Sequence, residues 1–194
     1  IDSKKYLLCE SAESNEATAY QLDKEYNILG EVYLTKGRLL DPVIFKHADK
    51  NYLLASTRKD IQEYEIVIFP FENLALSKDK EINYIVNKGY ERNAGSIINY
   101  EGKKIRPGQI LEPNYGSGIV FNEIQDIDEG IREKLFITLL PEDISTSSTG
   151  VHTVSNKNIY NVVDLRYEKF YFLAFLIKAI RILRKEYMKV KHND

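Results

Sequence analysis

The feature that most constrains the fold of this chain is a short segment that recurs along it. The copies read SKKYLLCES from Ser3, DKNYLLAST from Asp49, GKKIRPGQ from Gly102 and NKNIYNVVD from Asn156. We align them on Tyr6, Tyr52, Ile105 and Ile159. Each copy is a polar turn followed by a run suited to a buried strand. Because β-type units that recur about every 50 residues are typical of propeller blades, the repeat predicts a β-propeller.

Composition limits the classes of protein to which the chain can belong. Its 194 residues are 43% hydrophobic and 29% charged, enough for the core of one domain. A formal net charge of -2 excludes a global field that would recruit nucleic acid. The single cysteine, Cys9, excludes an intrachain disulfide and a multi-cysteine zinc site. This cysteine content does not determine the cellular compartment, and we slightly favour the cytoplasm.

The two ends of the sequence carry separate expectations. The chain lacks an initiator Met and opens inside a repeat unit, so we interpret it as a fragment or a processed product. No signal peptide is recognisable, and no apolar run reaches the roughly 18 residues that a membrane span needs.

Short strands joined by turns are predicted through most of the chain. VIFKHADKNYLLAST has the outline of a β-hairpin, and EYNILGEVYL predicts a strand with a turn near Gly30. INYIVNKG predicts a short outer strand, four strands follow between AGSIINY and KLFITLLP, and STSSTG has the composition of a flexible linker.

The C-terminal residues 170–194 have a different pattern. Basic side chains recur there at helical spacing opposite Leu176, Ile177, Ile180 and Leu183. We therefore predict an amphipathic α-helix of about 20 residues, distinct from the blades at 1–169. One interpretation of its basic face is binding to a membrane surface. The interpretation that we favour is a helix packed on its own domain or on a protein partner, with its charges solvated.

Several of these segments together resemble a known family. DPVIFKHADKNYLLAST resembles a unit of five-bladed propellers related to family 43 glycoside hydrolases. RNAGSIINYEGKKIRPGQ and YGSGIVFNEI are similar to the N-terminal domain of glucosamine inositolphosphorylceramide transferases and their bacterial relatives, as are YLLCESAE, GVHT and NVVD. The resemblance covers about residues 1–170 and implies an all-β, partial five-bladed propeller of about three to four blades.

The chain departs from the family pattern at two positions. Cys9 stands where the family has Pro before a Glu, and Ile110 stands where it usually has Asp after Gln. A whole five-bladed domain needs about 250 residues, so the first blade or more lies outside this chain. In family 43 enzymes that blade supplies the base carboxylate.

Candidate catalytic residues follow from the chemistry of glycoside cleavage, which uses one protonated and one ionised carboxyl group across the scissile bond. Asp41, at the head of a blade, is the candidate base or the neighbour that sets the pKa of the acid. Glu10 and Glu123, each at the end of an apolar strand, are candidate acids. The structural alternatives are that Asp41 caps a turn beside Pro42 and that Glu123 pairs with a surface Lys.

Candidate ligand-binding residues lie mainly in the polar stretch 92–123. Arg92 and Arg106 can bind sugar hydroxyls, a carboxylate or a phosphate. Gln109 and Tyr115 can orient hydroxyls, and His152 can line the site or simply be a buried, hydrogen-bonded histidine. One His makes a poor metal site and the glycines near Tyr115 lack nucleotide-loop spacing, so we expect no metal and no cofactor.

These residues lead to one site hypothesis and two functional ones. We expect Asp41, Arg92, Arg106, Gln109 and Glu123 to converge on one concave face. The acid would then be whichever of the two glutamates lies farther from the arginines, because their charge lowers carboxyl pKa values. The predicted function is a glycan-handling domain with a carbohydrate or sugar-phosphate ligand, glycosidase-like or accessory to a sugar transferase. The alternative is a non-catalytic carbohydrate-binding or scaffolding module.

Overall fold

The computed structural model describes residues 5–11, 13–60, 63–72, 75–76, 84–127, 130–157 and 160–167. Within them almost all regular structure is β-strand, and the only helix is the short α1 (Pro141–Ile144). The predicted all-β class is therefore confirmed. The helix expected at 170–194, with its boundary at residue 169 and its membrane or protein partner, lies outside the described residues.

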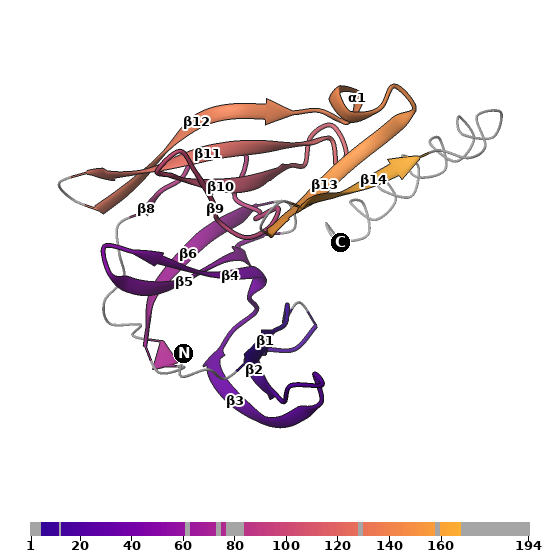
Figure 1. The fold of residues 1–194 in the computed structure, drawn as a ribbon. Coiled ribbons are helices and arrows are strands. Elements are labelled where there is room, and N and C mark those ends of the chain that lie inside the picture. The colour runs from indigo at the N-terminus through magenta and orange to yellow at the C-terminus, as the bar shows by residue number, and fades with distance from the viewer. Residues whose placement is uncertain are drawn as a thin grey trace, which may run out of the picture.

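Four sheets follow one another along the chain (Figure 1). The first sheet has the order β1 (Lys5–Leu8), β2 (Glu16–Leu22), β3 (Ile28–Lys36). The second has the order β4 (Leu40–His47), β5 (Lys50–Arg58), β6 (Tyr64–Glu72), β7 (Ala75–Leu76). The third has the order β8 (Tyr84–Ile85), β12 (Gly130–Leu139), β11 (Gly118–Ile127), β10 (Lys103–Ile110), β9 (Ile98–Tyr100). The fourth pairs β13 (Ser148–Lys157) with β14 (Tyr160–Tyr167).

The sequence repeat corresponds to the turn and second strand of a hairpin. Positive φ angles at Ala48 and Asp49, and again at Glu101 and Gly102, give two-residue loops of the type that matches the twist of the flanking strands. The turn predicted within HADKN is thus confirmed, and β5 and β10 are the repeated strands.

Three details of the sequence-based prediction were wrong. β14 begins at Tyr160, so the position equivalent to Tyr52 is Val162 rather than Ile159. Gly30 lies inside β3, because the turn forms earlier, where Asp23 accepts a hydrogen bond from the Asn27 amide at 2.8 Å. Half of the STSSTG segment, Ser148–Gly150, is part of β13 rather than of a linker.

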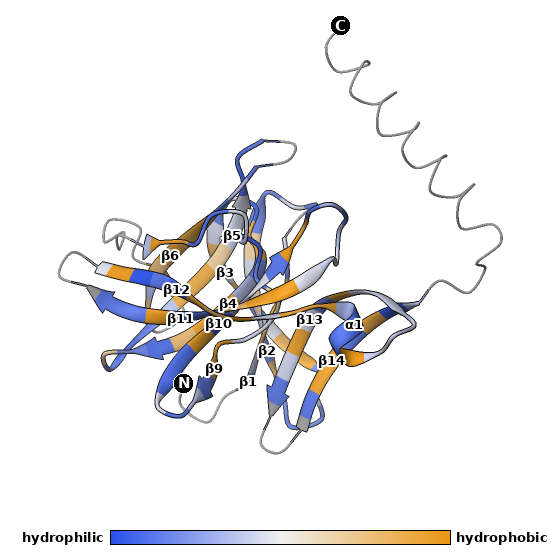
Figure 2. Ribbon diagram, turned by 90° about the horizontal axis from the view of Figure 1, so that it is seen from above, coloured by the Kyte–Doolittle hydropathy of each residue, from blue (hydrophilic) through white to orange (hydrophobic). Residues whose placement is uncertain are grey.

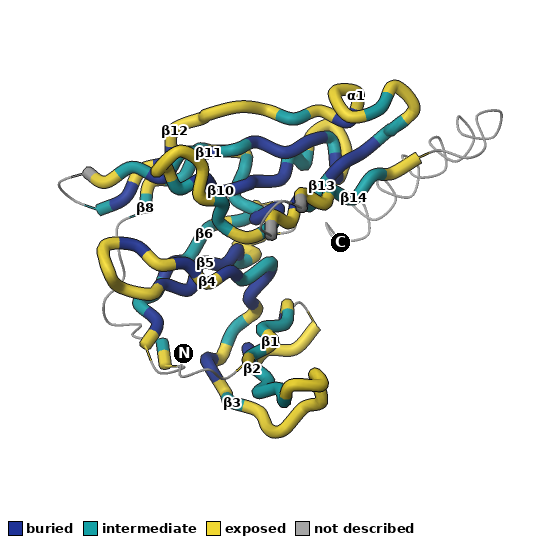
Figure 3. The backbone as a smooth tube through the Cα atoms, viewed as in Figure 1, coloured by how far each residue is buried: buried dark blue, intermediate teal, exposed yellow. Residues whose placement is uncertain are grey.

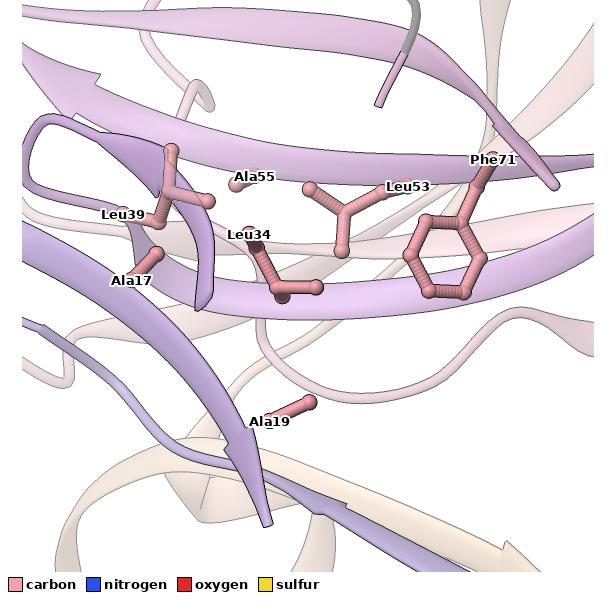
Figure 4. Close-up of a cluster of buried hydrophobic side chains, with 7 residues drawn as sticks. All are labelled: Ala17, Ala19, Leu34, Leu39, Leu53, Ala55 and Phe71. Atoms are coloured by element: carbon pink, nitrogen blue, oxygen red, sulfur yellow. The ribbon is translucent and has the colours of Figure 1, made fainter. Parts of the chain in front are cut away.

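Apolar side chains fill the space between successive sheets. The second sheet is buried on both faces, as a propeller blade is, and β5 shows how: Leu53 and Ala55 pack toward the first sheet, whereas Tyr52 and Leu54 pack toward the third. The cluster between the first two sheets consists of Ala17, Ala19, Leu34, Leu39, Leu53, Ala55 and Phe71 (Figure 4). A third cluster joins the third sheet to β13 through Ala94, Ile119, Val151 and Val154.

Burial is deepest in the inner strands and falls toward the outer ones. β5 and β10 are largely buried, whereas most of β3 and β12 is exposed (Figure 3). Apolar stretches lie along the strands, and polar residues gather at turns and strand ends (Figure 2). Polar side chains buried at the strand ends are therefore the features that packing alone leaves unexplained.

Candidate functional site

Asp41 and Arg92 form the centre of a polar cluster at one end of the sheets. Asp41 is the second residue of β4, and Arg92 lies in the segment that leads into β9. The Arg92 Nε lies 2.5 Å from Asp41 Oδ2, and the guanidinium also lies over the Tyr64 ring at 5.2 Å. Burial alone would lower the pKa of Arg92, but its bond to Asp41 outweighs that effect and the pKa is raised.

The segment Arg92–Gly95 is held tightly between the second, third and fourth sheets. The Ser56 hydroxyl of β5 donates to the Glu91 carbonyl at 2.7 Å. On the other side, the Ala94 carbonyl accepts from the Val154 amide at 2.7 Å. A Cβ on Gly95 would stand 2.0 Å from the Val154 carbonyl oxygen, so the small-Gly pair in this motif permits a close backbone approach. The sheets thereby fix the position of Arg92.

Asn93 and Gln109 connect this segment to Asp41. The Asn93 side-chain amide donates to the Asp41 carbonyl at 2.8 Å. The Gln109 amide donates to the Asn93 carbonyl at 2.6 Å and to Asp41 Oδ2 at 3.4 Å. Both side chains are fully buried, and the Gln109 Oε1 has no hydrogen-bond partner among the described residues. These buried side chains therefore orient Asp41 from the interior of the protein. The Asp41 side chain itself keeps 21% of its surface exposed.

Arg106 forms a second, fully buried layer under the cluster. Its guanidinium pairs with Glu133 of β12, donates to the Tyr90 carbonyl at 2.9 Å and donates to Asn93 Oδ1 at 3.2 Å. The Tyr84 hydroxyl donates to Glu133 as well, at 2.7 Å. With no exposed surface, Arg106 acts on the cluster through Asn93 rather than by contact with a ligand.

Glu10 lies at the edge of the cluster, just after β1. Its Oε1 lies 4.0 Å from Arg92 Nη2, and its side chain is 41% exposed. The pKa of Glu10 is raised, first by burial and then by the negative charge of Asp41, against the opposing charge of Arg92. A carboxyl group with a raised pKa thus lies beside Asp41, which accepts hydrogen bonds from Arg92 and Gln109.

Tyr115, His152 and Asp164 form the other side of the cluster. The rings of Tyr115 and His152 are 5.0 Å apart, and the His152 Nδ1 pairs with Asp164. Burial raises the pKa of Tyr115, which also senses the charges of Arg92 and Asp41. Asp164 Oδ1 accepts the backbone amides of His152 and Thr153, at a β-bulge in β13 where these amides leave the ladder.

Asp164 should make the stability of the fold dependent on pH in acid solution. Burial alone would raise its pKa, but the hydrogen bonds from Thr153 and His152 outweigh burial and lower the pKa below the ordinary 3.8. Its contribution is thus complete above that value and is lost as the pH falls through the lower, folded-state pKa. In urea unfolding, the unsubstituted protein should be more stable than Asp164→Asn at about pH 5, and this difference should shrink in stronger acid. A difference independent of pH would contradict this role.

The structure brings most of the sequence-predicted candidates together. Contacts or charge interactions link four of them: Asp41, Arg92, Gln109 and Glu10. Tyr115 and His152 adjoin these four, and Arg106 lies in the buried layer that contacts Asn93. Glu123 lies elsewhere, in an ion pair of 3.2 Å with Lys103. The reason is the two-residue period of β11, which turns Asn122 inward toward Asn87 and Glu123 to the other face.

The sequence did not indicate Asn93, Asp164 or Glu133. Among the residues that the structure describes, no group of three or more His, Cys, Asp or Glu side chains is arranged to hold a metal ion. The same residues include no helix with the length and apolar character needed to cross a membrane.

Comparisons with known proteins identify the fold. No protein-family model matches the chain, and no curated protein matches it. Among solved structures, the chain is similar to an exo-β-1,3-galactanase from Phanerochaete chrysosporium in complex with β-1,3-galactotriose. That match has 20% identity and a TM-score of 0.54 over 69% of this chain and 33% of that one. It is also similar to a GH43 β-1,3-galactosidase with galactodeoxynojirimycin, at 15% identity and a TM-score of 0.54 over 68% and 42% of the two chains.

At these identities the likeness shows the fold alone, and the chain spans less than half of either protein. This likeness agrees with the fold expected from the resemblance to family 43 glycoside hydrolases, and membership of that family stays a prediction. The number of blades and the relation to inositolphosphorylceramide transferases stay predictions.

Proposed function

We propose that the polar cluster binds a carbohydrate and cleaves a glycosidic bond, with Glu10 as the proton donor. The observation that carries the proposal is the position of Glu10, whose Oε1 lies 4.0 Å from Arg92 in the Asp41–Arg92 pair, where burial and the charge of Asp41 raise its pKa. Glycoside cleavage needs one carboxyl group that keeps its proton and another that stays ionised. Asp41, which accepts from Arg92 and Gln109, takes the second role as the base or as the charge that keeps Glu10 protonated.

Tyr115 supplies the sugar-binding surface in this proposal. Tyr115 is 51% exposed, and its ring packs against the ring of His152. The Tyr115 ring is therefore supported on one side and can receive a sugar ring on the other. Asp164 fixes His152 through Nδ1, and the exposed parts of Asp41 and Glu10 provide acceptors for hydroxyl groups.

A non-catalytic sugar-binding module is the second candidate. The observation that favours it is the engagement of Asp41 Oδ2 by Arg92 at 2.5 Å, which leaves that oxygen poorly placed to accept a proton from water. The sequence resemblance to transferase-associated domains fits such an accessory role, with a sugar or sugar-phosphate as ligand.

Calorimetric titration with β-1,3-galactotriose, the sugar in the structure of the galactanase neighbour, tests the binding site. Tyr115→Ala should weaken binding about tenfold, because a stacked aromatic contact is lost. Tyr100→Ala is the matched control, since Tyr100 is 49% exposed and also contacts one aromatic ring, that of Phe136. Equal effects of the two substitutions would place the sugar elsewhere. Release of galactose from the same trisaccharide supports the enzyme, and saturable binding without release supports the module.

A further inference from the structure

We propose a second binding site, in a cavity between the first and second sheets, for the acidic group of a sugar. The cavity has a volume of about 340 Å³, within the range of small-molecule sites. Its lining residues are Asn15, Thr35, Lys36, Gly37, Arg38, Leu39, Thr57, Arg58, Val67 and Phe69. None of them belongs to the polar cluster around Asp41.

The charge of the lining indicates an anionic ligand. Among the described residues, the cavity lining includes Lys36, Arg38 and Arg58 and no acidic residue, although the chain as a whole carries a formal net charge of -2. Arg58 is oriented by a hydrogen bond from its Nε to the Asp60 carbonyl at 3.1 Å. Guanidinium groups bind carboxylate and sulfate oxygens through paired hydrogen bonds. Because Lys36 and Arg58 have further interactions, the test rests on Arg38.

The loop that carries Arg38 is held in place by the first sheet. The Gly37 amide donates to the Asn15 carbonyl at 2.9 Å, and the Leu39 amide donates to the Ser11 hydroxyl at 2.8 Å. Gly37 has a φ of 132°, which the loop needs and an L side chain rarely adopts. On the opposite wall, Val67 and Phe69 of β6 offer an apolar surface on which a sugar ring can lie.

Residues that line the cavity adjoin residues of the polar cluster, both along the chain and across paired strands. Leu39 precedes Asp41 by two residues, and Ser11, which holds Leu39, directly follows Glu10. Arg58 pairs in register with Tyr64, whose ring contacts Arg92. One oligosaccharide can therefore reach both sites, with a neutral sugar at the cluster and a uronate or sulfate group at the cavity. The substrate class is then an acidic glycan, which rests on the proposed function.

Titration with three probes tests this site: neutral β-1,3-galactotriose, tri-galacturonate and a sulfated galactotriose. We expect at least one acidic probe to bind about tenfold more tightly than the neutral one, and whichever does so identifies the oxyanion. Arg38→Gln should remove this difference without changing the affinity for the neutral probe. Arg132→Gln, an exposed arginine on β12, is the matched control and should preserve the difference. Raising the salt concentration should weaken the acidic probe selectively.

The outcomes separate this site from the proposed function. Equal affinities for all three probes, or equal effects of Arg38→Gln and Arg132→Gln, would overturn the acidic site. If the acidic probe binds in an Arg38-dependent way while the neutral one does not bind, the acidic site stands and the proposed function fails. Circular dichroism of both variants checks that the exposed substitutions leave the fold intact.

Discussion

Replacing Glu10 with Gln is expected to lower the rate of glycoside cleavage by about 10²–10⁴-fold, the usual contribution of a positioned proton donor. Glutamine keeps the size of the side chain but has no proton to give to the leaving oxygen. Affinity for β-1,3-galactotriose should change only a few-fold, because the polar contacts of Asp41 and Tyr115 remain. A parallel loss of binding and rate would mean that Glu10 holds the sugar rather than protonates it.

The pH profile gives an independent measure of the same role. A proton donor is active below its pKa, so the rate should fall as the pH rises through the pKa of Glu10. Since burial and the charge of Asp41 raise that pKa, this fall should occur above the ordinary value of 4.5. The residual activity of Glu10→Gln should lack this limb of the profile.

Glu123→Gln distinguishes the two glutamates that the sequence offered as acids. The criterion of distance from the arginines would select Glu123, but that criterion fails because Glu123 pairs with Lys103 outside the cluster. Its substitution should therefore leave the rate nearly unchanged. Loss of activity in Glu123→Gln with activity kept in Glu10→Gln would reverse the assignment.

The sequence predicted the repeated strands and, through them, part of the cluster. Aligned on Tyr6, Tyr52 and Ile105, the repeat puts Glu10, Ser56 and Gln109 at the same position, near the end of β5 and β10 and just after β1. In the structure Ser56 and Gln109 both hold the segment around Asn93, and Glu10 lies within 4.0 Å of Arg92. An equal spacing from the aligned residue therefore carries side chains from three sheets to the same end of the molecule.

Residues that depend on irregular backbone could not be predicted in this way. Asp164 matters because a bulge in β13 frees two amides beside it, and no periodic pattern reveals a bulge. The last copy of the repeat was also misaligned by three residues, so Asp164 was not placed in its strand correctly. Glu133 was missed for another reason: IREK reads as an exposed charged stretch, although Ile131 and Glu133 share the buried face of β12.

Replacing Glu133 with Ala is expected to lower the free energy of unfolding by about 3–5 kcal/mol, because the buried charge of Arg106 loses its partner. Both side chains of the pair have no exposed surface. Tyr84 and the Asn87 amide would lose their acceptor as well. The change is measured by urea unfolding, and Glu123→Ala serves as the control because it breaks a partly exposed pair with Lys103, which should cost about 1 kcal/mol or less. Equal losses in the two variants would mean that water reaches Arg106.

A double variant shows whether the pair also supports the polar cluster. Arg106→Met with Glu133→Met removes both charges together, so its loss of stability should be smaller than the two single losses added. The Arg106 guanidinium donates a hydrogen bond to Asn93 Oδ1 at 3.2 Å, and the Asn93 side-chain amide donates one to the Asp41 backbone carbonyl at 2.8 Å. The double variant should therefore fold but bind β-1,3-galactotriose more weakly, because Asn93 loses the donor that fixes its side chain. Unchanged affinity in a folded double variant would confine the pair to stability and would mean that Asn93 keeps its hydrogen bond to the Asp41 carbonyl without Arg106.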